Sequence, residues 1–509
     1  MHTIVQEPWL PEKWDKEADV IVVGFGGAGA AAAITAHDLG TRVLMLEKAP
    51  EGEEGGNTRV AGQGYLQIYD VDKAITYLSA LCGHYAVPQK MVRAWAEEIR
   101  GNNDWVAGIG GDPQEHQHQP EGIEFPGADC THKFHNGDIL GYSNTWKFFE
   151  SAVKQRPIEI LYETPGRKLI QHGITGEILG IQAEQRGRPI HVKARKAVVL
   201  TCGGFENNQE MIRNYLPDLP YCYTSGTPHN DGDGIRMAQQ SGADLWHMNN
   251  YAGPSMALKV PEYKATFSMT PLHYSHEMRG GMIIIGPDAN RFVDEKLKPK
   301  HGKIKTSGQW RHMPVPCPMF MVFDHALFTS GPLYDKKPVS GWARIIERYE
   351  WSEDNSAELK RGWIKRADTL AALAEVIGLD SGTLEKSIQR WNHACESGVD
   401  HDFGRRRMLI PIGKPPYYAI ELSPSMLNTQ GGPRRNERGQ IVRPDDTPIP
   451  RLYSAGELGS IYSHLYQGTG NIGECLAFGR ISARNAVAEM PWDSVAGNWA
   501  TVRSDSWRQ

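Results

Sequence analysis

The sequence predicts an α/β fold in which one parallel-sheet domain is built from both ends of the chain and an α+β domain is inserted between them. Two short Val-rich runs, residues 18–23 and 196–200, are typical of buried parallel strands. Each run leads into glycines, and helix-forming sequence follows the first one. From about residue 251 to 423 the chain becomes rich in Pro, Met and aromatic residues, and glycine-rich segments return afterwards. The middle is therefore expected to be a separate domain.

The N-terminal elements are expected to run strand, glycine turn, helix, strand. Residues 18–23 form the first strand, the Ala-rich residues 28–39 form the helix, and residues 41–46 form the second strand. The turn reads Gly24-Phe-Gly-Gly-Ala-Gly29, and Glu47 follows Gly29 by 18 residues.

This order of elements is typical of a dinucleotide-binding, Rossmann-like unit. Gly24 is expected to make the tight turn, Gly26 to let the backbone reach a pyrophosphate, and Gly29 to let helix and strand pack closely. The N–H groups of Gly27 and Ala28 then lie at the positive end of the helix, where phosphates bind. Glu47 is placed to accept hydrogen bonds from ribose hydroxyls.

The later segments complete the expected organisation. Residues 230–238 have the pattern of a phosphate-side turn entering a helix. Residues 369–377 form an amphipathic helix, and Asp380 or Ser381 caps the helix that follows. Five lysines between residues 296 and 305 are interpreted as a solvated loop. The predicted division is residues 18–250 and 424–490 for the nucleotide domain, 251–423 for the insertion and 491–509 for a C-terminal tail.

The composition limits the possible functions. A net charge of −5 gives no reason to expect nucleic acid or an anionic membrane as partner. No apolar run is long enough to span a bilayer, and residues 1–16 lack the apolar core of a signal peptide, so a cytoplasmic protein is expected. The seven cysteines form no CxxC or Cys/His cluster, which argues against disulfides, iron–sulfur clusters and any metal site.

Only one complete GxGxxG unit is present. Gly108-Ile-Gly-Gly111 lacks a preceding strand and is followed by Asp-Pro, which ends a helix rather than opening one. Without a second nucleotide unit, electrons are expected to come from, or go to, a diffusible acceptor or a donor protein.

Taken in order, the motifs resemble the fumarate reductase and 3-ketosteroid dehydrogenase group of FAD-dependent flavoproteins. The matching segments are Gly24 to Glu47, Gly55-Gly-Asn-Thr58, Gly62-Gln-Gly64, Gly203-Gly-Phe205, Asp231-Gly-Asp-Gly234, Asn290-Arg-Phe-Val-Asp-Glu295, Gly398 to Arg405, Thr429-Gln-Gly-Gly432, Leu452 to Glu457 and Gly468 to Arg480. The resemblance implies a Rossmann-like FAD-binding domain built from both ends of the chain and an inserted capping, or substrate, domain.

The resemblance also implies which residues bind FAD. In this family the Glu of the Ala-Gly-Glu segment, here Glu457, reaches the ribityl chain. Residues 470–473 would open the last helix toward the flavin, where its positive end stabilises charge on the reduced ring. Succinate dehydrogenases of the family attach FAD through a His at the position of Asn57, so FAD is expected to be non-covalent here. The implied cofactor residues are Gly24, Gly26, Gly27, Ala28, Gly29, Glu47, Lys48, Gly55, Gly56, Asn57, Thr58, Gly62, Gln63, Gly64, Gly203, Gly204, Asp233, Glu457, Gly470, Asn471 and Ile472.

The fumarate reductase pattern fails at its catalytic positions. The arginine that donates the proton in that branch would fall at or near Pro299. Its His before Thr-x-Gly-Gly corresponds to Asn428, and its substrate-clamping Arg corresponds to Gln467. A dicarboxylate substrate is therefore not expected.

The ketosteroid dehydrogenase pattern fits at one position. Its Tyr before the final glycines corresponds to Tyr466, which can stabilise an enolate or relay a proton, although a packing role for this ring stays open. The second Tyr of that branch would again fall near Pro299. His273, Tyr274, His276 and Arg279 come from a segment that lies over the flavin in the family, and they are the other candidate catalytic residues.

The predicted function is an FAD-dependent oxidoreductase acting on a C–C bond adjacent to a carbonyl group, by α,β-dehydrogenation or ene reduction. The substrate is expected to be an uncharged or weakly charged small molecule, a class that includes cyclic, steroid-like compounds. Two alternatives remain open. One is an FAD-dependent hydratase or isomerase without net redox, and the other is the flavoprotein subunit of an electron-transfer complex.

Overall fold

The computed structural model describes residues 10–116, 120–335, 337 and 339–495, which form two compact units. Of these described residues, the terminal unit comprises those up to Met211, those in His229–Asn250 and those from Asn428 onward, and the central unit comprises those in Ile212–Pro228 and Tyr251–Leu427. Unlike the sequence-based division, this one assigns residues 212–228 to the central unit, because β10 (Tyr223–Thr224) pairs with a strand of its sheet. Of the predicted tail, residues 491–495 are described, and Trp492 donates to the carbonyl of Ala194; residues 496–509 lie outside the described residues.

The terminal unit contains the predicted parallel sheet, so the α/β fold is confirmed. Its strand order is β22-β23-β9-β1-β2-β6, with β8 and β7 added antiparallel at β9. β1 runs parallel to β2 and β9, while β6 and β23 extend the parallel run. The strands are β1 (Lys16–Val23), β2 (Val43–Leu46), β6 (Glu159–Leu161), β7 (Gly166–Gln171), β8 (Ile178–Gln185), β9 (Arg188–Leu200), β22 (Gln440–Val442) and β23 (Pro448–Ser454).

The register of these strands positions the candidate site. Because β1, β2, β9 and β23 are parallel, their carboxyl ends lie at one edge of the sheet. The glycine turn, Glu47, the Gly203–Gly204 segment and Glu457 follow these four ends in turn. Ligands of open α/β sheets bind outside this edge. The glycine segments that are far apart in sequence are therefore gathered at one place.

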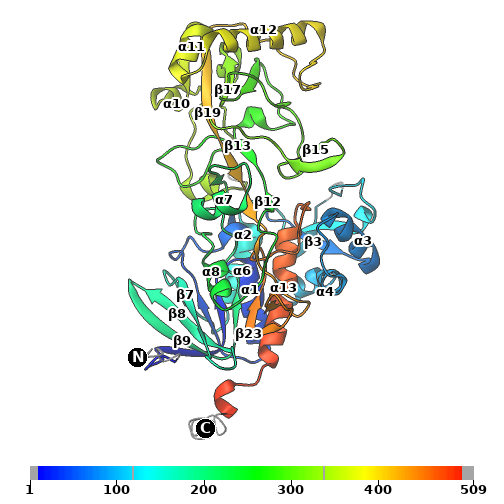
Figure 1. The fold of residues 1–509 in the computed structure, drawn as a ribbon, viewed down its shortest axis with the longest axis vertical. Helices are drawn as coiled ribbons and strands as arrows, with labels where there is room; N and C mark the ends of the chain where they lie inside the picture. Colours follow the sequence, from blue (N-terminus) through cyan, green and yellow to red (C-terminus); the bar gives the residue numbers. More distant parts are fainter. Residues whose placement is uncertain (1–9, 117–119, 336, 338, 496–509) are drawn as a thin grey trace, which may run out of the picture. The chain divides into compact units, whose positions relative to one another are not determined.

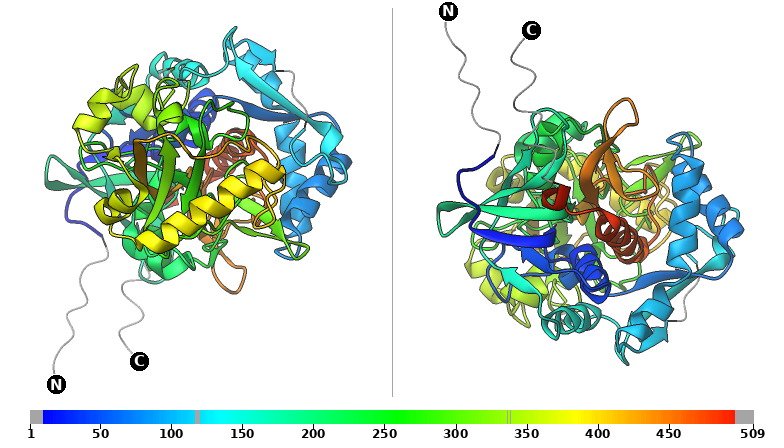
Figure 2. Two further views of the ribbon diagram at one scale, coloured as in Figure 1. Left: turned by 90° about the horizontal axis from the view of Figure 1, so that it is seen from above. Right: turned by 90° about the horizontal axis from the view of Figure 1, so that it is seen from below.

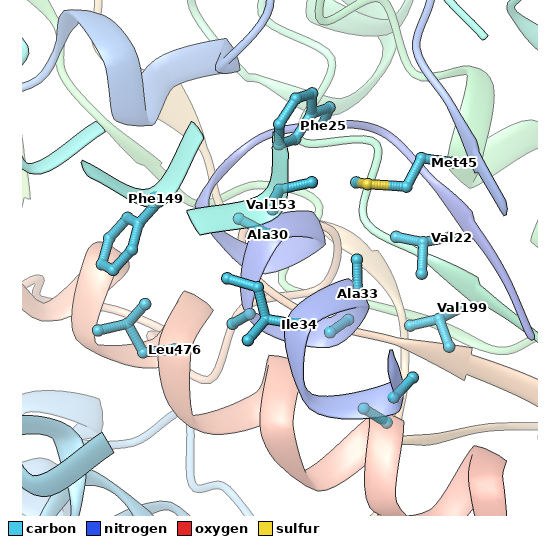
Figure 3. Packing of buried hydrophobic residues seen from close by; sticks show 14 of the residues in the cluster. Val22, Phe25, Ala30, Ala33, Ile34, Met45, Phe149, Val153, Val199 and Leu476 are labelled. Atoms are coloured by element: carbon cyan, nitrogen blue, oxygen red, sulfur yellow. The ribbon is translucent and has the colours of Figure 1, made fainter. Parts of the chain in front are cut away.

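Two helices with small side chains pack together beside this sheet. α1 (Gly27–Asp38) and α13 (Gly470–Ala488) lie side by side (Figures 1 and 2), and a side chain at Gly479 would meet Ala31 at 2.7 Å. Their interface joins one hydrophobic core with Val22, Met45 and Leu476 (Figure 3). The other helices of this unit are α2 (Gly56–Val60), α3 (Val71–Cys82), α4 (Gln89–Ile99), α5 (Asn102–Gly108), α6 (Asn144–Lys154) and α8 (Asp233–Gln240).

A smaller sheet carries residues that border the candidate site. Its order is β3-β5-β4, all antiparallel, and it places Leu66 opposite Lys133. Its strands are β3 (Tyr65–Ile68), β4 (Pro113–Glu115) and β5 (Thr131–Asn136). The remaining short strands outside the central unit's sheet are β11 (Leu245–Trp246), β12 (Tyr251–Ala252), β20 (Asn428–Thr429) and β21 (Gly432–Pro433), and α7 (Gln209–Tyr215) follows β9 in the chain.

The central unit is built on a second sheet, with order β10-β19-β17-β14 and with β13 and β18 also paired to β19. Its strands are β13 (Ser255–Ala257), β14 (Met282–Ile285), β17 (Met319–Asp324), β18 (Lys365–Ala367) and β19 (Tyr417–Met426), and β15 (Lys303–Thr306) and β16 (Gln309–His312) form a hairpin. α11 (Leu370–Ile377) and α12 (Ser381–Ser397) pack on this sheet through Leu373, Ile388 and Trp391, and Figure 2 shows α12, in yellow, lying across the strands. Shorter elements are α9 (His325–Phe328), α10 (Ser356–Lys360), the 3-10 helices Ala128–Cys130, Thr270–Leu272 and Trp492–Val495, and the π-helix Ala343–Glu347.

Several local predictions can be checked directly. The helices predicted after residues 369 and 380 are confirmed, and the side chains of Thr369 and Asp380 cap them; Ser381 is the first helical residue. The lysine-rich segment is only partly a solvated loop, since Lys296 and Lys303 are buried. None of the seven cysteines forms a disulfide, and no cluster of metal-ligating side chains occurs within the described ranges. In the part of the chain that the structure describes, every helix is too short or too polar to cross a membrane.

Candidate functional site

The glycine turn after β1 leaves no room for side chains at two positions. Gly24 has φ of +104°, and a Cβ atom there would lie 2.5 Å from the carbonyl oxygen of Thr201. A Cβ at Gly29 would overlap the carbonyl oxygen of Gly24, so α1 and β1 pack as closely as their backbones allow. Both glycines therefore occupy positions whose geometry requires glycine.

The N-terminus of α1 has no side-chain cap. Gly26 is its N-cap and provides no capping side chain, and the N–H of Ala28 faces the thiol of Cys475. The N–H of Gly27 donates to the Thr58 hydroxyl (3.1 Å), and the N–H of Gly55 donates to the carbonyl of Phe25 (2.8 Å). The Gly55–Thr58 segment, with Gly56 opening α2, is thus held against the glycine turn.

Two charged groups flank this turn. The buried carboxylate of Glu47 accepts from the N–H groups of Phe25 (2.6 Å) and Ala49 (2.7 Å), and burial raises its pKa. Lys48 forms ion pairs with Asp231 (2.6 Å) and Asp233 (3.0 Å), so the two predicted cofactor residues Lys48 and Asp233 are matched to each other.

The Gly62–Gly64 loop is fixed by its own middle residue. Gln63 is buried with φ of +69°, and its side chain donates to the carbonyl of Thr58 (2.7 Å) and accepts from the N–H of Trp146 (2.9 Å). Its carbonyl accepts from the Thr145 hydroxyl (2.8 Å), so its side chain and its carbonyl are both held within the protein. Gly64 is covered by the side chains of Lys133 and Thr469.

An acid pair follows the carboxyl ends of β9 and β23. The side-chain nitrogen of Asn57 donates to Glu206 (2.8 Å) and to Glu457 (2.9 Å). Glu206 is fully buried beside Gly204, while Gly203 contacts Asn230. Asn471 also approaches Glu457, at 3.4 Å. Burial and the neighbouring charge of Glu206 raise the pKa of Glu457 to about 8.

The start of α13 carries unsatisfied polar atoms. Gly470 and Asn471 begin the helix without a side-chain cap, and Ile472 packs into the core. Within the described residues, the buried side-chain oxygen of Gln430 and nitrogen of Gln467 make no hydrogen bond. Buried polar atoms are rarely left in this state, so a polar ligand with both donors and acceptors is expected there.

Tyr466 lies immediately before this helix. Its ring meets Tyr462 edge-on at 5.4 Å between ring centres. Burial, followed by the negative charge of Glu121, raises the pKa of the Tyr466 phenol, while backbone hydrogen bonds from Asn471 and Thr469 oppose the shift. The phenol therefore stays protonated at neutral pH and can act as a hydrogen-bond donor.

The other candidate catalytic residues belong to the central unit. His273 and Arg279 are exposed, while Tyr274 and His276 are partly buried. The Lys296 ammonium donates to the carbonyls of Pro271 (2.6 Å), His273 (3.1 Å) and His276 (3.1 Å). Burial and this lysine lower the pKa of both histidines, which therefore favours their neutral form.

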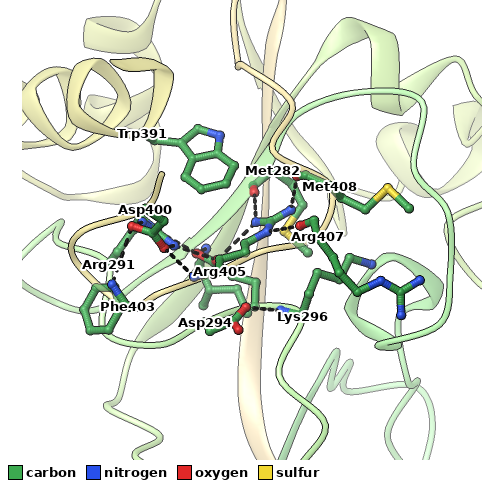
Figure 4. A network of polar contacts seen from close by, with 12 residues as sticks. Met282, Arg291, Asp294, Lys296, Trp391, Asp400, Phe403, Arg405, Arg407 and Met408 are labelled. Atoms are coloured by element: carbon green, nitrogen blue, oxygen red, sulfur yellow. Dashed lines mark hydrogen bonds and ion pairs between the residues drawn. The ribbon is translucent and has the colours of Figure 1, made fainter. Parts of the chain in front are cut away.

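Lys296 borders a buried charge network built from two of the motifs (Figure 4). Arg291 forms paired hydrogen bonds with Glu295 (both 2.9 Å) and with Asp400 (both 3.0 Å). Arg405 donates to Glu295 at 3.1 Å and, like Arg291, lies over the ring of Trp391. The Asn290–Glu295 and Gly398–Arg405 segments thus meet in a structural core of the central unit.

Sequence reasoning missed Glu206, Gln430 and Lys296. Glu206 directly follows the motif Gly203-Gly-Phe205, and Gln430 lies within Thr429-Gln-Gly-Gly432. These neighbouring motifs could have identified both residues as candidates. Lys296 was missed because it belongs to the lysine-rich segment that was interpreted as a solvated loop. The candidate residues of the terminal unit are gathered at one sheet edge, whereas His273, Tyr274, His276 and Arg279 belong to the other unit.

The sequence matches a protein family and several characterised proteins. A family model described as "FAD binding domain" matches residues 19–472. Urocanate reductase and digoxin reductase of Eggerthella lenta are each 28% identical over 94% of this chain, covering 76% and 89% of those proteins. The 3-oxosteroid 1-dehydrogenase of Mycolicibacterium smegmatis is 27% identical over 93% of this chain and 98% of its own length.

Solved structures share the fold. The 3-ketosteroid Δ1-dehydrogenase of Sterolibacterium denitrificans superposes with a TM-score of 0.72, at 23% identity over 93% of this chain and 100% of that chain. The open form of a flavocytochrome c3 fumarate reductase gives a TM-score of 0.68, at 22% identity over 93% of this chain and 78% of that one.

Proposed function

Since the chain belongs to the FAD binding domain family, we propose that it uses dissociable FAD to oxidise or reduce a C–C bond adjacent to a carbonyl group. It is an FAD-dependent oxidoreductase that acts on CH–CH groups. The proposed substrate is an uncharged or weakly charged small molecule, in a class that includes cyclic, steroid-like compounds. The direction of the reaction is set by a diffusible electron donor or acceptor.

The residues of the terminal unit fit FAD. The positive end of α1, which has no side-chain cap, favours the pyrophosphate, and Glu47 stands beside it for the ribose. The unsatisfied amide atoms of Gln430 and Gln467 suit a flavin ring edge, which carries both donors and acceptors. When bound, FAD supplies the group that exchanges a hydride with the substrate.

Dissociable FAD follows from Asn57, because an amide cannot form the covalent bond that a histidine forms. Its nitrogen is already bonded to Glu206 and Glu457. Acid precipitation of the yellow protein should release all of the flavin into the supernatant. Flavin that stays with the pellet would contradict this part of the proposal.

The observation that carries the proposed chemistry is the place of Tyr466 at the start of α13. Its protonated phenol can donate to a carbonyl oxygen, and the positive end of that helix favours negative charge on the same oxygen. Donors at that oxygen stabilise the enolate that forms when the adjacent carbon gains or loses a proton. His273, Tyr274, His276 and Arg279 remain the other proposed catalytic residues, and the lowered pKa of the two histidines favours the neutral form of each.

The proposed substrate excludes fumarate and succinate. Burying a dianion without paired cations costs several kcal/mol per carboxylate. The positions where the fumarate reductase branch carries His and Arg are the buried amides Asn428 and Gln467, and Pro299 replaces the second arginine. Arg279 alone would leave one carboxylate unmatched.

The test is anaerobic reoxidation. Holoprotein reduced with dithionite should be reoxidised within seconds to minutes by at least one compound of a panel of cyclic and linear enones, and millimolar fumarate should leave it reduced. Rapid reoxidation by fumarate would overturn the substrate class. Conversion of a substrate by hydration or isomerisation without a change in the flavin spectrum would overturn the redox function, and co-purification of a haem or iron–sulfur subunit would favour an electron-transfer complex.

A further inference from the structure

A single amide joins two acids in the terminal unit. The NH₂ group of Asn57 has two hydrogens, and one donor direction is used for Glu206 Oε1 (2.8 Å) and the other for Glu457 Oε2 (2.9 Å). The two carboxyl groups are therefore neighbours across one nitrogen atom. Glu206 follows β9 by six residues and Glu457 follows β23 by three, and β9 and β23 are adjacent parallel strands.

The remaining partners of the acid pair are uncharged. Glu206 accepts from Asn230 (2.8 Å) and from the Thr429 hydroxyl (3.2 Å), and Glu457 accepts from Asn471 (3.4 Å). The ionisable groups that face the pair from the surrounding elements are Glu474, Cys475 and Tyr466. The nearby basic side chains are paired with other acids: Arg435 with Glu474, Lys48 with Asp231 and Asp233, and His229 with Glu53. Among the described residues, no cation neutralises either acid.

Two buried carboxylates in this position repel each other. When one is ionised, the second ionises only at higher pH, and the pair titrates as a unit. Burial raises the pKa of Glu206, and burial together with the charge of Glu206 raises that of Glu457 to about 8. At pH 7 the pair therefore retains a proton.

The acid pair is coupled to the phosphate end of the site through α2. Asn57 bridges the two acids, and the next residue, Thr58, receives the N–H of Gly27 at the start of α1. A dianion bound at the N-terminus of α1 would approach Thr58, the residue next to the bridging Asn57. Its charge opposes ionisation of the acids, since like charges in a partly buried site interact strongly.

We propose that Glu206 belongs to the cofactor site, where it and Glu457 share one proton that must be present for FAD to bind tightly. The proposal rests on the proposed assignment of Glu457 to FAD binding. In this proposal the negative charge of the pyrophosphate opposes full ionisation of the acid pair. The shared proton limits the pair to a single negative charge while FAD is bound.

The experiment measures the dissociation constant of FAD for the apoprotein between pH 6.5 and 9.5. The wild type should bind with constant affinity up to about pH 8 and then lose up to tenfold per pH unit, because one proton is taken up on binding. Glu206→Gln and Glu457→Gln each remove one acid, so each should show a flat profile above pH 8. Glu97→Gln, at an exposed position of α4, is the matched control and should keep the wild-type slope.

Riboflavin is the second probe, because it lacks the pyrophosphate. Its weaker binding should show no slope above pH 8. A flat FAD profile for the wild type, or a slope retained in Glu206→Gln, would overturn the inference while leaving the enone chemistry intact. Failure to bind FAD at any pH would instead overturn the proposed function as well.

Discussion

Two buried acid clusters, one in each unit, hold their charges in opposite ways. In the central unit, Glu295 and Asp400 are each bonded to at least one arginine, and the arginines also stack on Trp391. In the terminal unit, Glu206 and Glu457 are bonded only to amides and a hydroxyl. Matched charges of the first kind hold a fold in one arrangement, whereas perturbed, unmatched groups of the second kind are typical of functional sites.

The difference separates two kinds of family motif. In this chain the Asn290–Glu295 and Gly398–Arg405 segments have a structural role, since their buried charges are satisfied by each other. The glycine segments and Glu457 leave uncapped helix ends, amides and a carboxyl group for a ligand. Substitutions in the first group should change stability, and substitutions in the second should change binding or turnover.

The largest effect is expected at Tyr466. Tyr466→Phe removes the phenol that is proposed to donate to the substrate carbonyl, and turnover should fall by about two to four powers of ten, the usual loss for an acid–base group. Tyr462→Phe is the matched control, because the hydroxyl of Tyr462 makes no hydrogen bond among the described residues and its loss should cost little. Steady-state turnover and FAD content decide the outcome. Equal turnover in both variants would assign Tyr466 a packing role.

Arg405→Met tests the structural side of the comparison. Removing one partner from a buried, charged network leaves Glu295 with one arginine fewer, and the free energy of unfolding should fall by about 3–5 kcal/mol. FAD affinity should stay within twofold of the wild type. Denaturant titration measures the free energy of unfolding, and flavin binding measures the affinity for FAD. A large loss of FAD affinity in a folded protein would contradict a purely structural role for this network.

A smaller, pH-dependent effect is expected at Lys296. Burial and the nearby arginines lower its pKa to about 8, so between pH 8 and about 10.4 the unfolded chain binds the extra proton. Stability conferred by Lys296 should therefore rise with pH across this window, by about 1–3 kcal/mol in total. The difference in unfolding free energy between the wild type and Lys296→Met, measured at pH 7.5 and 10, should grow by that amount. A constant difference would show that the ammonium keeps its ordinary pKa.

Local patterns were enough for much of the fold. The glycine turn, the strands on either side of it and the capped helices α11 and α12 depend on residues close together in sequence, and all were predicted within a few residues. The acid pair depends on contacts of Asn57 across 149 and 400 residues, which no spacing rule contains. The burial of Lys296 was also invisible, because a run of lysines suggests solvent until its backbone carbonyl partners are known.

The most direct test of the contrast between matched and unmatched charge is the stability of two glutamine variants. For a carboxyl group whose folded pKa is raised to about 8 from about 4.3 in the unfolded chain, stability is lost as pH rises through this window. Glu206→Gln removes the repulsion, so its apoprotein should unfold at higher denaturant concentration than the wild type at pH 9 and at the same concentration at pH 4. Glu295→Gln should unfold at lower denaturant concentration than the wild type at pH 9, because it breaks a matched network. Equal losses of stability in both variants at pH 9 would contradict the account.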